Sequence, residues 1–199
     1  MKTVNFILIL FFFVFKTSFA STYNSDPKLF VEELVNDAIN KLSDKNATEE
    51  EKVIFIEKIA LENVDIDALG LYTLGELRKS TEEGLLNKYQ ESFKKYFLKS
   101  LTSRLRDYSS NEFEIVESEK KSSNYTMVKS KILENGDMPE IKIDWRIYTK
   151  DPDKPLIRDL IVEGLSLART QKEEFASILS SNNNDINLLI LKLEEFVKN

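Results

Sequence analysis

The order of hydrophobic and polar positions along the chain predicts helices first, then strands, then helices again. From Asp26 to about position 108, apolar residues recur every three or four positions, which is the spacing of one helix face. From 113 to 162 they tend to recur every second position, which is typical of half-buried strands. The helical spacing returns after Gly164 and continues to about Val197. We therefore expect an α+β domain.

Capping residues mark where the predicted helices begin. The first helix should start at Asp26, with Pro27 in its first turn, and the second at the capping box Thr48–Glu51, with an end near Leu61. Asp65 precedes a short third helix, and the capping box Ser80–Glu83 starts a fourth. The last of these opens the longest helix, which runs to about Tyr108. Its spacing predicts one broad apolar face, which includes Phe93, Phe97, Leu101 and Leu105.

The clearest strand pattern runs from Ile141 to Tyr148. Ile141, Ile143, Trp145 and Ile147 alternate there with Lys142, Asp144, Arg146 and Tyr148, so one face should be buried and the other solvated. Other strands are expected at 113–115, 125–133 and 156–162, the last with Leu156, Arg158, Leu160 and Val162 on one face. The prediction is a four-stranded antiparallel sheet covered on one face, followed by two C-terminal helices at about 167–179 and 185–197.

The first 20 residues have the composition of a cleavable signal peptide. Lys2 provides the positive start, Phe6 to Phe15 is an uncharged apolar run, and Ser18-Phe19-Ala20 ends in small residues at the cleavage positions. The run is about half the length that a membrane-spanning helix needs. We expect cleavage after Ala20, export out of the cytoplasm, and a single domain over 21–199.

Composition narrows the possible functions. Residues 21–199 carry a net charge of −8, compared with −6 for the whole chain, because the first 20 residues hold Lys2 and Lys16 and no acid. This charge disfavours nucleic-acid binding, which depends on cations. The chain has no histidine and no cysteine, which excludes Ser-His-Asp and Cys-His enzymes and argues against zinc. We expect no catalytic residues, metal or cofactor; a hydrolase that uses two carboxylates is the remaining enzymatic alternative.

The apolar residues of the long helix and of the third and fourth strands allow two interpretations. They can fill an ordinary core between helix and sheet, or they can line a cavity for an apolar ligand. Pattern alone does not separate the two, because a filled core and a lined cavity use the same residues.

Several ordered motifs carry a resemblance to a known family. The first is a strand that ends in Val162-Glu163-Gly164-Leu165-Ser166 and is followed by a helix with Phe175 and Leu179. The second is the segment Asn63–Asp67, followed by Leu74-Gly75 and a capped long helix with Tyr96. The third is the strand Asp144–Ile147. With the signal peptide, this order resembles the MlaC family over nearly the whole chain. That family is the periplasmic phospholipid-binding component of the Mla lipid transport system, also described as the toluene-tolerance ABC transporter auxiliary component. The departures are Leu77, where many members have tryptophan, and Asn182–Asn184, which replace a usual glycine.

The resemblance implies a monomeric soluble carrier that is exported across the inner membrane to the periplasm and holds phospholipid tails in an apolar cavity. Its implied partners are an inner-membrane ABC transporter complex and an outer-membrane lipoprotein complex, in a system that serves outer-membrane lipid asymmetry. The expected cavity wall consists of Phe97, Leu101 and Leu105 on the long helix and Ile143, Trp145, Ile147, Leu160 and Val162 on the strands. The alternative from another class is a periplasmic adaptor module with a filled core and no ligand.

Overall fold

A computed structural model describes residues 23–105, 112–134, 136 and 139–199; the expected signal peptide at 1–20 lies outside this part. The elements are α1 (Pro27–Ser43), α2 (Glu49–Asn63), α3 (Ile66–Thr73), the 3-10 helix η1 (Gly75–Lys79), α4 (Glu83–Leu105), β1 (Phe113–Ser122), β2 (Tyr125–Ile132), β3 (Ile141–Tyr148), β4 (Leu156–Val162), β5 (Leu165–Ser166), α5 (Leu167–Ser180) and α6 (Ile186–Lys198). The predicted α+β fold with two C-terminal helices is confirmed.

Three of the four predicted helix starts are fixed by side-chain caps. Asp26 accepts hydrogen bonds from the backbone N–H groups of Lys28 and Leu29 at the start of α1. Thr48 and Glu51 form a reciprocal capping box at the start of α2. Asp65 caps α3 by accepting from the backbone N–H of Ala68. Local polar sequence therefore determines where these helices begin.

The sheet is antiparallel, in the order β1-β2-β3-β4-β5. The two-residue β5 adds a fifth strand to the four predicted. The predicted first strand, 113–115, is too short, because β1 continues to Ser122. A register shift between Ile115 and Glu117 interrupts the two-residue alternation at Val116, which hides the rest of the strand from pattern reading.

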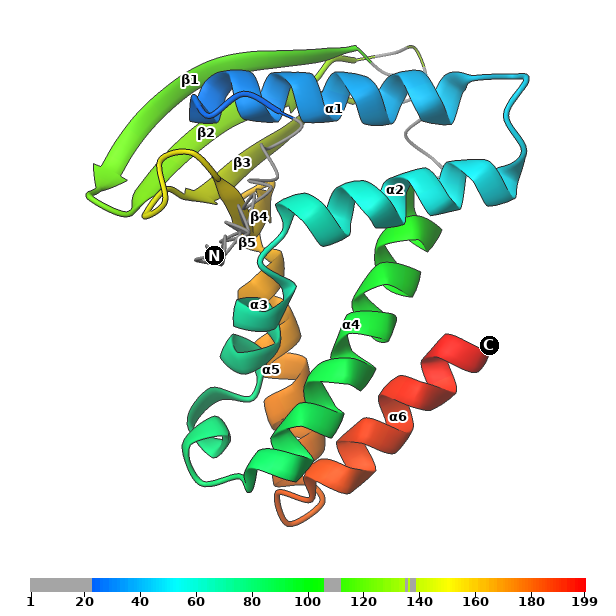
Figure 1. The fold of residues 1–199 in the computed structure, drawn as a ribbon, viewed down its shortest axis with the longest axis vertical. Coiled ribbons are helices and arrows are strands. Elements are labelled where there is room, and N and C mark those ends of the chain that lie inside the picture. Colours follow the sequence, from blue (N-terminus) through cyan, green and yellow to red (C-terminus); the bar gives the residue numbers. More distant parts are fainter. Residues whose placement is uncertain (1–22, 106–111, 135, 137–138) are drawn as a thin grey trace, which may run out of the picture.

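One face of the sheet, here called the inner face, is covered by α1 (Figure 1). The sheet core combines Tyr23, which precedes α1, with residues of α1, of α2 and of this inner face: Phe30, Val31, Leu34, Ile59, Val128, Trp145, Ile147 and Ile157. The opposite, outer face carries cross-strand ion pairs between Lys129 and Glu117 and between Lys131 and Glu114. The predicted sheet with one covered face is confirmed.

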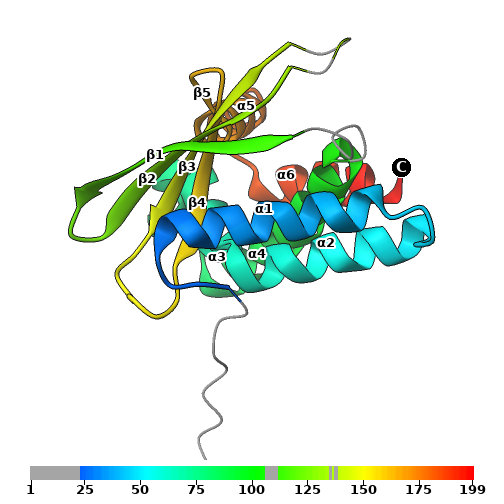
Figure 2. The ribbon, with the colours of Figure 1, turned by 90° about the horizontal axis from the view of Figure 1, so that it is seen from above.

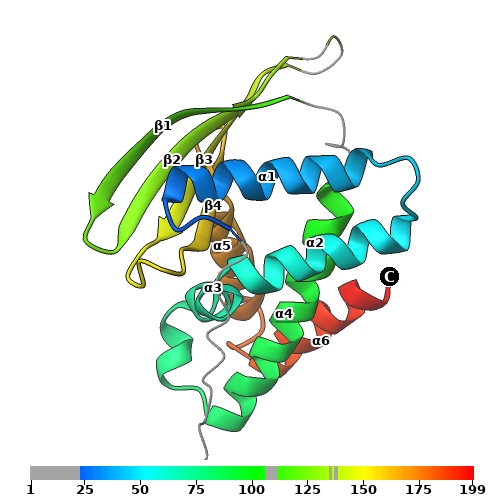
Figure 3. The ribbon, with the colours of Figure 1, turned by 45° about the horizontal axis from the view of Figure 1, so that its top comes forward.

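A second core lies among the remaining helices, beyond the β4 side of the sheet (Figure 3). This helix core consists of Ile66, Leu74, Tyr89, Phe93, Phe175, Leu179, Ile186, Leu189, Ile190 and Leu193. Val64, at the junction of α2 and α3, packs against both cores. Within the described part of the chain, no helix has the length and hydropathy needed to cross a membrane.

The expected common face of Leu156, Arg158, Leu160 and Val162 on β4 is wrong. A bulge at Arg158 shifts the register, so that Trp145 lies opposite Leu160 and Ile147 lies opposite Ile157. Ile157 therefore replaces Arg158 on the inner face. Leu156 pairs with Tyr148 instead, away from the apolar row.

Candidate functional site

The predicted strand residues form one continuous apolar surface on the inner face. Ile143 lies opposite Val162, and Trp145 lies opposite Leu160. Directly opposite residues of an antiparallel pair place their side chains on the same face, so these four side chains are neighbours. Trp145 and Ile147 are buried in the sheet core, whereas Ile143, Leu160 and Val162 are half-buried. The surface thus becomes more open towards Ile143 and Val162.

Trp145 is fixed by a hydrogen bond that could not be predicted from the sequence. Its indole N–H donates to Oγ of Ser130 at 2.9 Å, and that hydroxyl donates to the backbone carbonyl of Ile143 at 2.8 Å. Phe113 meets the indole edge-to-face, with ring centroids 6.4 Å apart. A buried tryptophan needs a partner for its N–H, and Ser130 provides it, so the ring stays within the apolar surface at no polar cost.

Of the predicted residues of α4, Phe97 belongs to a different part of the molecule. Phe97 is half-buried and packs against the helix core, where its ring lies 6.3 Å from that of Phe93. Leu101 is half-buried one turn further along α4. Leu105 ends α4, and its side chain lies outside the described part. The structure thus groups Ile143, Trp145, Ile147 and Leu160 in or against the sheet core and places Phe97 against the helix core.

The two cores are joined by a polar contact at the α2–α3 junction. The backbone N–H of Asp65 donates to the carbonyl of Ile157 at 2.9 Å, beside a parallel bridge between Val64 and Ile157. The guanidinium of Arg158 contacts the Asp65 carboxylate at 2.6 Å and lies 3.4 Å from the ring centroid of Tyr148. Asp65 therefore both caps α3 and holds that helix to β4.

Sequence reasoning missed this contact. Asp65 was expected only as a helix cap, and Arg158 only as a member of an apolar strand face. An arginine within a strand that is otherwise rich in apolar residues is a signal for a buried carboxylate partner, although the sequence does not say which one.

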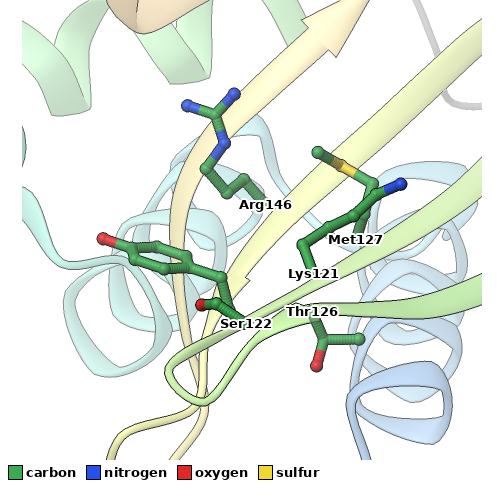
Figure 4. A pocket seen from close by; sticks show the side chains of 6 residues that line it. Lys121, Ser122, Thr126, Met127 and Arg146 are labelled. Atoms are coloured by element: carbon green, nitrogen blue, oxygen red, sulfur yellow. The ribbon is translucent and has the colours of Figure 1, made fainter.

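A hollow of about 410 Å³ lies on the outer face, at the end of the β1–β2 hairpin (Figure 4). Six residues line it, two of which are cationic: Lys121, Ser122, Tyr125, Thr126, Met127 and Arg146. Both of its cations already have acidic partners, since Lys121 pairs with Glu119 and Arg146 contacts the buried Asp159 at 3.3 Å. None of the residues predicted for the lipid-binding wall lines this hollow.

A second hollow, of about 310 Å³, lies between the start of α4 and the start of α6. Leu77 and Asn184 both line it, so the two departures from the family pattern meet in space. This place is at the far end of the helix core from the sheet (Figure 1). Among the described residues, no three acidic side chains converge as a metal site would need.

Comparison with protein families matches the description "MlaC protein" over residues 32–195, which is most of the chain. The chain belongs to the MlaC family. The match begins within α1 and ends within α6, so it includes the whole sheet, the helix core and all of the sheet core except Tyr23, Phe30 and Val31. The family resemblance noted from the sequence motifs is confirmed.

A solved structure shares this MlaC fold. It is described as the phospholipid-binding protein from Ralstonia solanacearum in complex with a phospholipid. The superposition has a TM-score of 0.70 and 17% sequence identity, and it covers 84% of this chain and 94% of the other. At this identity the likeness establishes the fold. A search of curated proteins gives no significant match.

Proposed function

We propose that this MlaC-family chain is a soluble periplasmic phospholipid carrier. It holds acyl chains against the apolar inner face of the sheet and carries them through the aqueous periplasm. The observation that carries the proposal is the half-buried apolar surface of Ile143, Leu160 and Val162, on a fold shared with a protein that was solved with a phospholipid bound. The proposal assigns no catalytic residue to the chain.

The energetics explain why a carrier is needed. An acyl chain in water is disfavoured by about 0.8 kcal/mol for each methylene, so a chain of about 15 methylenes faces a barrier on the order of 12 kcal/mol. A protein that surrounds the tail with apolar side chains removes this barrier. Bilayer and protein are both apolar, so transfer between them is close to balanced, and the direction of transport must come from partners.

The partners in this proposal are an outer-membrane lipoprotein complex and an inner-membrane ABC transporter. The headgroup stays in water, so selection among headgroups is weak. Residues 1–20 are proposed to direct export and to be removed after Ala20. The carrier is proposed to be monomeric during transit.

A second candidate function is an adaptor module that binds no lipid. The observation that favours it is the tight packing of the deepest inner-face residues, since Val128 and Ile147 are both 0% exposed. In that case the half-buried residues are only the margin of a filled core.

Native mass spectrometry of purified residues 21–199 separates the two. Expression in a bacterium with its export signal intact allows the protein to meet phospholipid. We expect a protein mass plus one or more phospholipid masses, with the lipid released by organic extraction. Protein that is lipid-free, and that extracts no phospholipid from vesicles, supports the adaptor instead.

A further inference from the structure

One row of the inner face runs from the sheet core out to solvent. Ser130 on β2, Ile143 on β3, Val162 on β4 and Leu165 on β5 lie opposite one another in register, so their side chains share the inner face. Ser130 is 2% exposed, Ile143 and Val162 are half-buried, and Leu165 is 68% exposed. The apolar surface proposed for lipid binding therefore continues, without a polar interruption after Ser130, to an exposed leucine.

Leu165 is more exposed than any other large hydrophobic residue in the described part of the chain. The other exposed ones include Ile54 on α2 and Leu191 on α6, which lie on helix surfaces. Single exposed leucines are ordinary on protein surfaces. Leu165 differs because it extends a half-buried apolar row, while Leu191 does not belong to the sheet.

The exposed position of Leu165 is built by a tight turn. Glu163 and Gly164 connect β4 to β5 with φ values of 49° and 81°, both in the left-handed region that a two-residue hairpin turn requires. Gly164 adopts this conformation freely, but Glu163 is strained in it. Strain of this kind persists where the surroundings impose it, and it is often found at ligand-binding sites.

Hydrogen bonds on both sides of the turn maintain it. The backbone N–H of Glu163 donates to the carbonyl of Lys142 at 3.0 Å, and the Lys142 N–H donates to the Glu163 carboxylate. On the next residue after Leu165, the Ser166 hydroxyl donates to the buried Asp159 at 2.7 Å. β5, which carries Leu165, therefore forms a fixed edge strand of the sheet (Figure 2).

We propose that Leu165 is the threshold of the lipid-binding surface: the residue that an acyl chain contacts first on entry and last on exit. The inference rests on the proposed carrier function and goes beyond it by assigning the route. A tail that moves along Leu165, Val162 and Ile143 stays in contact with apolar side chains as it leaves water. Leu165 thus lowers the barrier to transfer without forming the deepest part of the site.

The test measures the rate of lipid transfer separately from the amount of lipid bound. Residues 21–199, stripped of lipid, are mixed with phosphatidylcholine vesicles that carry a fluorescent phospholipid, and uptake is followed in time and at equilibrium. Leu165→Asp is compared with Leu165→Met, which keeps an apolar side chain. Leu191→Asp is the matched control, because it adds the same charge at a residue that is 54% exposed on α6.

We expect Leu165→Asp to slow uptake by about tenfold, because an acyl chain loses one apolar contact at the barrier and meets a charge. Final occupancy and melting temperature should stay near those of the wild type, and Leu165→Met and Leu191→Asp should transfer lipid at the wild-type rate. Equal rates for Leu165→Asp and Leu191→Asp overturn the threshold role. A loss of equilibrium occupancy in Leu165→Asp also overturns it, because Leu165 then belongs to the site itself. A wild type that takes up no phospholipid contradicts the carrier function, and the threshold role with it.

Discussion

At the scale of single residues, the two cores use polar atoms only where each has a partner. Tyr89 is fully buried in the helix core, and its hydroxyl lies 2.7 Å from that of Thr73. Tyr23, in the sheet core, is 8% exposed and has a pKa raised to about 12, by burial first and then by Asp37. Burial likewise raises the pKa of Tyr89. The fold therefore keeps both phenols protonated to a higher pH than an unfolded tyrosine.

This predicts a loss of stability in alkali. An unfolded tyrosine ionises near pH 10, whereas the folded chain holds the protons of Tyr23 and Tyr89 to higher pH. Their contribution is complete below pH 10 and is lost as the pH rises towards the folded pKa values, because only the unfolded state then releases protons. Urea unfolding at pH 8 and pH 11 should show a smaller decrease for Tyr89→Phe than for the wild type. Parallel decreases contradict the assignment.

At the scale of elements, Asp65 holds together the junction between α2, α3 and β4. Asp65 caps α3, its N–H bonds to Ile157, and its carboxylate pairs with Arg158. Both side chains of this ion pair are less than one-third exposed, so solvent screens the pair less than a surface pair. The contact couples the start of a helix to the bulge of a strand.

We expect this coupling to be measurable in a double-mutant cycle. Asp65→Asn keeps a capping side chain but removes the charge, and Arg158→Met keeps the apolar stem of the arginine. The coupling free energy between the two substitutions should be on the order of 1 kcal/mol, obtained from denaturant unfolding of the two single variants and the double variant. The same cycle with the exposed pair Glu76 and Lys79 is the control, and it should give a smaller value. Additive effects of the two substitutions contradict an energetic coupling between Asp65 and Arg158.

Elements were predictable from sequence where the signal was local. The caps at Asp26 and Thr48 and the alternation from Ile141 to Ile147 each depend on residues close together in the chain, and each is confirmed. The β1 extension and the Arg158 bulge were not predictable, because a bulge breaks the two-residue period from which a strand is recognised. The pairing of Arg158 with Asp65 joins residues 93 positions apart, and pattern carries no information about such pairs.

At the scale of the whole molecule, the division into two cores was not predictable either. Sequence spacing placed Phe97 and Leu101 opposite Trp145, as if one core joined the long helix to the sheet. Instead, α1 covers the inner face at β1 and β2, and α4 packs mainly on α6 and α3. Amphipathic spacing shows that a helix has a buried face, but it does not show which element covers that face.

Truncations of Ile147 and Leu101 compare the interior of a core with the expected margin of a cavity. Ile147 is 0% exposed, so Ile147→Ala should lower the free energy of unfolding by about 2–5 kcal/mol. Leu101 is half-buried, and Leu101→Ala should cost less than Ile147→Ala if the residue faces a lipid site. Urea unfolding of lipid-free protein measures both.

Leu160→Asp then tests the same surface for binding. Leu160 is half-buried and lies opposite Trp145, so a carboxylate there can reach water in the lipid-free protein but is desolvated when acyl chains cover the inner face. We expect a protein that still folds, by circular dichroism and cooperative melting, and that retains no phospholipid in native mass spectrometry. Leu191→Asp, with the same added charge on α6, should retain lipid like the wild type. The opposite result has three parts: Leu160→Asp unfolds, Leu101→Ala loses much stability, and the wild type carries no lipid. Together they identify these residues as core and favour the adaptor.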